Sequence, residues 1–156
     1  SISPNYYDFA YKRQLQDWKA WVEKGIADEL LIQIYRPDLA SYLPQLSRAE
    51  VMAARTRIPT AIALMSGQRN RPTPMPLIRE KVLANRRQGL GTGFFYLESL
   101  WTLGPEASDE RIEALRQLLA PAPGPLSAPA QDPPPPAPPP PPPPLPSPPP
   151  PPPPLP

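Results

Sequence analysis

The chain contains no cysteine and no histidine among its 156 residues. Disulfides, thiolate or imidazole zinc sites and the usual nucleophile and base pairs are therefore excluded. Any catalysis has to come from carboxylates, tyrosine, lysine, arginine or serine, and no metal or other cofactor is expected. No run approaches the roughly 20 apolar residues that a transmembrane helix needs, and no basic-then-apolar signal opens the chain.

Charge of one sign is also scarce, since 16 Lys and Arg stand against 14 Asp and Glu, a net charge of +2. This balance is too mild to indicate nucleic-acid binding, and no basic run interleaves with the aromatic residues. Glycine-rich phosphate loops are missing after every candidate strand. A nucleic acid is therefore not expected as a partner, and a nucleotide-binding open sheet has no support.

Proline, in contrast, is abundant and unevenly spread: 24 of the 32 prolines lie in the last 36 residues. Residues 121–156 carry one charge and no aromatic side chain, so they cannot bury enough apolar surface to fold. We predict a folded domain over residues 1–120 and a disordered, extended polyproline tail over 121–156. Two interpretations of the tail stay open: a stiff spacer or anchor, or a ligand for a polyproline-binding domain.

The folded part alternates predicted strands with predicted helices, and the opening SISPN looks like the end of a strand. Strands buried on both faces and separated by helices predict right-handed β-α-β units and a parallel sheet. Pro74 near the start of a helix, Gly25 and Gly89 after helices, and a capping box at Ser47 and Glu50 mark helix ends. The expected strands span 29–35, 59–67 and 92–100, and the expected helices 8–24, 47–57, 73–88 and 108–119.

Polar and aromatic side chains gather just after each predicted strand, which is where a (β/α)8 barrel keeps its active site. This clustering favours a barrel over an open sheet. Guanidinium groups and aromatic rings at such an edge can bind sugar hydroxyls and stack on sugar rings. The candidate substrate-binding residues are Asn5, Gln33, Tyr35, Arg36, Arg69, Tyr96 and Trp101.

Glu98 is the candidate catalytic residue, because strand alternation would place it on one face with Phe94 and Tyr96. A carboxylate there can act as acid, base or nucleophile. The structural alternative is an ion pair with Arg36 or Arg69 at a strand end.

Three other residues also have structural alternatives. Trp101 could pack between the last strand and helix. Asp38 is a weaker second acid that could simply cap the next turn, and for Arg71 a solvated loop charge and a binding role both stay open.

Five segments resemble, in this order, the C-terminal half of the glycosyl hydrolase-like 10 barrel family, particularly its cyanobacterial members: SPNYYDFAY, LQDWKAWVEKG, ELLIQIYRPDL, IPTAIALMSGQRNRPTP and GTGFFYLESLW. The resemblance covers roughly residues 1–119. It implies an α/β fold, about four β/α units forming the C-terminal half of a TIM-type (β/α)8 barrel.

The resemblance also implies a glycoside hydrolase-like protein that acts on or binds a polysaccharide or cell-envelope glycan, in an extracytoplasmic or secreted location. The first four barrel units, with any acidic residue they supply, would not be in this chain. Whether the chain is itself an enzyme therefore stays open. The alternative function is a non-catalytic interaction or anchoring protein that uses its polyproline tail. A partial barrel leaves sheet edges open, so self-association is expected.

Overall fold

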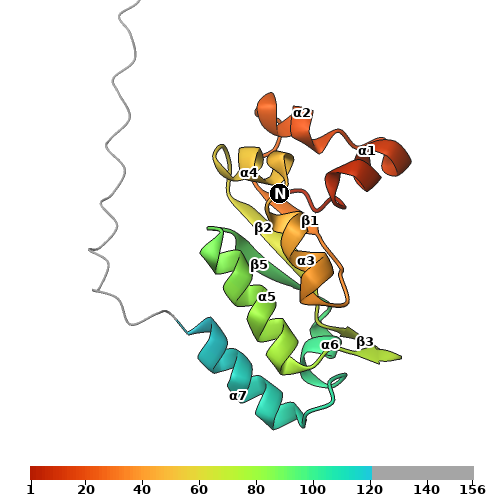
Figure 1. The fold of residues 1–156 in the computed structure, drawn as a ribbon, viewed down its shortest axis with the longest axis vertical. Coiled ribbons are helices and arrows are strands. Elements are labelled where there is room, and N and C mark those ends of the chain that lie inside the picture. The colour runs from red at the N-terminus through yellow and green to blue at the C-terminus, as the bar shows by residue number, and fades with distance from the viewer. Residues whose placement is uncertain (121–156) are drawn as a thin grey trace, which may run out of the picture. The chain divides into compact units, whose positions relative to one another are not determined.

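The structure, a computed structural model, describes residues 1–120, which form one compact unit. Strands and helices alternate along this unit (Figure 1), so the predicted α/β class is confirmed. The polyproline tail predicted over residues 121–156 lies outside the described residues, and so do both interpretations of its role. In chain order the elements are α1 (Tyr7–Gln14), α2 (Trp18–Glu23), β1 (Leu30–Gln33), α3 (Leu39–Leu46), α4 (Ala49–Arg55), β2 (Thr60–Met65), β3 (Gly67–Gln68), β4 (Arg71–Pro72), α5 (Met75–Arg87), β5 (Gly91–Phe95), α6 (Leu97–Trp101) and α7 (Ser108–Leu119).

A parallel sheet joins three strands in the order β1-β2-β5. The first residues of the chain add a short parallel segment beside β1, through bridges from Ile2 to Leu30 and from Asn5 to Gln33. The predictions of a parallel sheet and of an extended opening segment are therefore confirmed. Because all four segments run in the same direction, their carboxyl ends meet at one edge of the sheet.

The sheet buries one face more than the other. Leu30 and Ile32 of β1 are fully buried, whereas Leu31 and Gln33 on the opposite face stay partly exposed. Figure 1 shows α3 and α5 in front of the strands, and the fully buried Ile78 of α5 joins the same core cluster as Leu30. The predicted burial on both faces is therefore wrong for β1. Each buried Leu or Ile stabilises the fold by about 1.5–3 kcal/mol, so the helix-covered face holds most of the core.

The long first helix predicted from the sequence is interrupted, so that prediction is wrong. Helix α1 ends at Leu15, whose φ of 56° lies in the left-handed region, and α2 begins after Asp17. The Asp17 carboxylate accepts hydrogen bonds from the Ala20 N–H at 3.1 Å and from the Tyr7 hydroxyl at 3.0 Å. These bonds cap α2 and tie it to α1. Trp18 of α2 is fully buried and belongs to the hydrophobic core.

Between β1 and β2 the chain forms two short helices where the sequence pattern predicted one. Asp38 caps α3, because its carboxylate accepts a hydrogen bond from the Ser41 N–H at 2.7 Å. Helix α4 has Arg48 rather than Ser47 at its N-cap position. The Glu50 carboxylate binds the Arg48 guanidinium instead of a backbone N–H. The capping alternative for Asp38 is thus confirmed, and the predicted capping box is wrong.

The later elements follow the prediction more closely. The helix expected over residues 73–88 is confirmed as α5, followed by Gly89 with a positive φ of 65°. The helix expected over 108–119 is confirmed as α7. The strand expected over 92–100 is too long, because β5 stops at Phe95 and α6 begins two residues later. No helix within residues 1–120 is long and apolar enough to cross a membrane.

Candidate functional site

A groove opens at the edge where the parallel strands end. It lies between the loop after β1, the hairpin of β3 and β4 that follows β2, and the start of α5. Its volume of about 600 Å³ is typical of a small-molecule site. We call it the strand-end groove. Its lining residues are Tyr35, Arg36, Pro37, Met65, Gln68, Arg71, Pro72, Thr73, Pro74 and Leu77.

Tyr35 belongs to an aromatic cluster that continues after β5. Its ring stacks on Phe95 with centroids 5.3 Å apart and planes inclined by 28°, and Phe95 meets Tyr96 edge-on at 5.5 Å. Phe95 is 46% exposed although it is a large apolar side chain. Burial raises the pKa of the Tyr35 hydroxyl, which therefore stays protonated and able to donate a hydrogen bond. The cluster offers apolar ring faces beside the groove.

Arg36 forms the wall of the groove next to Tyr35. Its guanidinium lies over the Tyr6 ring, 4.6 Å from the centroid, as a cation–π contact. Its carbonyl oxygen accepts a hydrogen bond from the Lys81 ammonium at 2.6 Å. Lys81 is 2% exposed, and burial lowers the pKa of its ammonium while the Asp38 carboxylate acts in the opposite direction. Both the side chain and the backbone of Arg36 are therefore held in place.

The hairpin after β2 decides which of its arginines reaches the groove. Gln68 of β3 pairs with Arg71 of β4, so Arg69 falls in the two-residue turn between them. Arg71 lines the groove together with Gln68, and Arg69 is not among the lining residues. The sequence pattern had left Arg71 open between a binding residue and a solvated loop charge. The structure therefore brings Arg71, rather than Arg69, together with Tyr35 and Arg36.

Asn5 and Gln33 lie at the same edge of the sheet but are bonded to the protein itself. The Gln33 amide nitrogen donates to the Ser3 carbonyl oxygen at 2.7 Å. The Asn5 amide nitrogen donates to the Gln14 side-chain oxygen at 3.2 Å. Neither residue lines the strand-end groove. Their side chains connect the first segment of the chain to β1 and α1.

Glu98 lies in the first turn of α6, not in a strand. The strand alternation that placed it on one face with Phe94 and Tyr96 is therefore wrong. Its carboxylate is exposed, and no residue in the described part of the chain forms an ion pair with it, Arg36 and Arg69 included. Within residues 1–120, no group of three or more acidic side chains could hold a metal ion. Glu98 is thus a single unpaired carboxylate near the end of β5.

An ion pair between a buried arginine and a partly buried glutamate, which the sequence analysis did not find, anchors this edge. Arg111 of α7 is 0% exposed, and its guanidinium binds the Glu106 carboxylate at 2.6 Å. Its helical spacing with Leu115 and Leu118, both buried, was a signal that this arginine faces the core. The same guanidinium donates to the carbonyl oxygens of Leu100, Thr73, Ser99 and Ser66, at 3.0, 3.1, 3.2 and 3.4 Å respectively.

Glu106 and Ser99 extend this network to the start of α5 and to the end of β5. Burial alone would raise the pKa of the Glu106 carboxyl, but hydrogen bonds from backbone N–H groups, including that of Met75 at 2.8 Å, and from Arg111 lower it overall. The Ser99 hydroxyl lies 2.7 Å from the Ser66 hydroxyl and accepts a bond from the Tyr96 N–H at 3.1 Å. The network therefore holds α6, the hairpin and α5 in one arrangement.

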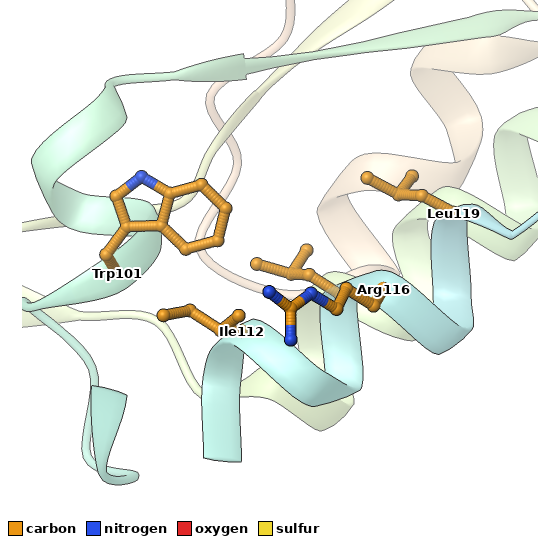
Figure 2. A pocket seen from close by; sticks show the side chains of 5 residues that line it. Trp101, Ile112, Arg116 and Leu119 are labelled. Carbon is orange, nitrogen blue, oxygen red and sulfur yellow. The ribbon is translucent and has the colours of Figure 1, made fainter. Parts of the chain in front are cut away.

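A second groove, of about 540 Å³, runs along α7 and is almost wholly apolar. Figure 2 shows Trp101 on α6 at one end and Leu119 at the other, with Ile112 and Arg116 between them. Trp101, predicted to stack on a sugar ring, lines this groove and packs against the hydrophobic core. It does not line the strand-end groove, so the structure does not bring it together with Tyr35.

These features define an α/β protein with a parallel sheet and a groove at its carboxyl edge, where such folds bind ligands. The model of the glycosyl hydrolase-like 10 family matches residues 1–85, more than half of the chain, and the chain therefore belongs to this family. The match includes Arg36 and Arg71 but ends before β5 and Glu98, whereas the resemblance expected from the sequence ran to residue 119. Searches of curated proteins and of solved structures found no match.

Proposed function

We propose that this chain is the glycan-binding part of a glycoside hydrolase-like domain, with a polysaccharide or cell-envelope glycan as its ligand. One observation carries the proposal: Tyr35 lines the strand-end groove, stacks on Phe95 and is followed by Arg36 on the same wall. A sugar ring presents an apolar C–H face bordered by hydroxyl groups. An aromatic ring beside a guanidinium matches both features, and membership of the family supports the same ligand class.

We also propose that the parallel segments are the last four units of a TIM-type (β/α)8 barrel. The segments lie side by side in chain order, with the opening segment next to β1, then β2 and β5. In a barrel the face away from the helices is the interior, which agrees with the partial exposure of Leu31 and Gln33 in a sheet of four segments. A cell-envelope or extracellular glycan as ligand implies an extracytoplasmic or secreted location.

For hydrolysis, Glu98 is the proposed catalytic carboxylate. Glycoside hydrolysis generally uses two carboxyl groups about 5–9.5 Å apart. Glu98 is exposed and unpaired within residues 1–120, whereas Asp38 already caps α3. Since a second acid is needed, the role proposed for this chain alone is glycan binding, and hydrolysis is proposed for a barrel that supplies that acid.

The proposal is tested by isothermal titration calorimetry of the full chain with oligosaccharides of several sugar compositions. Tyr35→Ala should weaken binding about tenfold, equivalent to about 1.4 kcal/mol, because the stacking ring is lost. Tyr11→Ala is the matched control, since Tyr11 is 50% exposed on α1 and does not line the groove. If Tyr35→Ala lowers stability but leaves binding intact, Tyr35 only packs the fold. If no oligosaccharide binds, the proposed function is wrong.

A further inference from the structure

The strand-end groove carries positive charge. Arg36 and Arg71 both line it, and no Asp or Glu is among its lining residues. Neither arginine forms an ion pair with an acidic side chain anywhere in residues 1–120. They come from different walls, one from the loop after β1 and the other from the β3–β4 hairpin. Two guanidinium groups without a protein counter-ion therefore border one cavity.

Asp38, the acidic residue that follows Arg36 and Pro37 in the chain, is already engaged elsewhere. Asp38 accepts hydrogen bonds from the Ser41 N–H at 2.7 Å and from the Ser41 hydroxyl at 2.9 Å, and these bonds lower its pKa. The buried Lys81 ammonium contributes a positive charge that acts on Asp38 and donates to the Arg36 carbonyl oxygen. Asp38 and Lys81 thus offset each other, and the charges of Arg36 and Arg71 remain for a ligand.

The balance of hydrogen-bond donors and acceptors in the groove also favours a negatively charged ligand. A guanidinium offers five donors and no acceptor, so each arginine needs acceptor atoms on the ligand. Among the lining side chains only Tyr35, Gln68 and Thr73 carry an oxygen that accepts. A neutral sugar hydroxyl both donates and accepts, whereas a carboxylate or sulfate group only accepts. The groove, which is rich in donors and poor in acceptors, therefore suits an anionic ligand better than a neutral one.

We infer that the strand-end groove recognises an anionic glycan, in which the sugars carry carboxylate or sulfate groups. Arg71 and Arg36 bind the anionic oxygens by charge-assisted hydrogen bonds, and Tyr35 lies against an adjacent ring. Arg71 is exposed on the short β4 strand, so it provides charge selectivity without supporting the core. The inference rests on the proposed function, because it specifies the class of glycan that the same groove takes.

The test compares three hexasaccharide probes by isothermal titration calorimetry on the full chain: one of glucose, one of galacturonic acid and one of sulfated glucose. The acidic probes should bind at least about tenfold more tightly than the neutral one at physiological salt, where screening beyond about 8 Å removes distant charge effects. The acidic probe that binds more tightly identifies the preferred anionic group. Binding of either acidic probe should weaken as salt is raised.

Arg71→Gln should lower affinity for the acidic probes about tenfold and leave affinity for the neutral probe unchanged. The matched control is Arg87→Gln, which removes the same charge from an exposed position in the last turn of α5. Equal affinity for neutral and acidic probes would overturn the inference while leaving glycan binding in place. Equal losses in the Arg71 and Arg87 variants would also overturn it, and absence of binding to every probe would refute the proposed function.

Discussion

Arg111→Met is predicted to destabilise the protein strongly. The substitution leaves the Glu106 carboxylate without its partner at 2.6 Å and removes the donor for four backbone carbonyl oxygens. Arg111 is 0% exposed, so water has little access to the carbonyl oxygens that it binds, whereas the Glu106 side chain is 25% exposed and can be partly hydrated. Removing one partner of a fully buried ion pair costs about 3–5 kcal/mol, and because the Glu106 side chain is 25% exposed the expected cost lies at the lower end of that range. Domains have a total stability of about 5–15 kcal/mol, so the loss is a large fraction of it.

The assay is urea denaturation followed by circular dichroism, with free energies from linear extrapolation. Arg116→Met is the control, because Arg116 lies on the same helix with a side chain that is 75% exposed. Its substitution should change stability by less than about 0.5 kcal/mol. Adding Glu106→Gln to Arg111→Met should recover part of the loss, since the unpaired carboxylate is then gone. A cost for Arg111→Met as small as that of the control would refute the reasoning.

Three further predictions concern acid stability, catalysis and assembly. The pKa of Glu106 is lowered in the folded state, so this carboxylate stabilises the fold above pH 4.5, its usual pKa, and the contribution is lost as pH falls through the folded-state pKa. In Glu106→Gln the melting temperature should therefore fall less steeply at acid pH, and an unchanged dependence of melting temperature on pH would contradict this. Glu98→Gln should abolish any glycan hydrolysis that the protein shows, without a change in melting temperature. The control Glu110→Gln on α7 should leave hydrolysis intact, and retained hydrolysis in the Glu98→Gln variant would exclude Glu98 as the catalytic residue. The outer edge of β5 is unpaired within residues 1–120, so light scattering should show concentration-dependent self-association, and a constant mass of 17.2 kDa would disprove it.

The strands and the longer helices could be predicted because their signals are local. The apolar runs 29–35 and 59–67 contain β1 and β2, and Pro74 and Gly89 flank α5. Helix α3 was missed because Pro44 lies inside it. Its stability comes instead from tertiary packing, since Tyr42 and Leu46 of α3 are almost fully buried.

Two boundaries show where local pattern is ambiguous. The run after Gly93 fits a strand and a helix equally well, because a short apolar segment has too few residues to reveal its period. The Ser99 hydroxyl favours the helix, because it accepts a hydrogen bond from the Tyr96 N–H and donates one to the Tyr96 carbonyl oxygen at the start of α6. Leu15 adopts a left-handed conformation that few leucines favour, at the break between α1 and α2. The Asp17 carboxylate stabilises this break, because it accepts hydrogen bonds from Tyr7 of α1 and from Ala20 of α2.

By itself the sequence determined the order of the main strands β1, β2 and β5 and of the helices α5 and α7, the parallel direction of those strands and the edge where polar side chains gather, because these depend on patterns within about 10 to 15 residues. Only the tertiary structure decided which of those side chains share a groove. The register of the β3–β4 hairpin selects Arg71 over Arg69, and helix packing places Trp101 along α7. Arg111 meets carbonyl groups from three separate segments, and no local pattern encodes such a meeting.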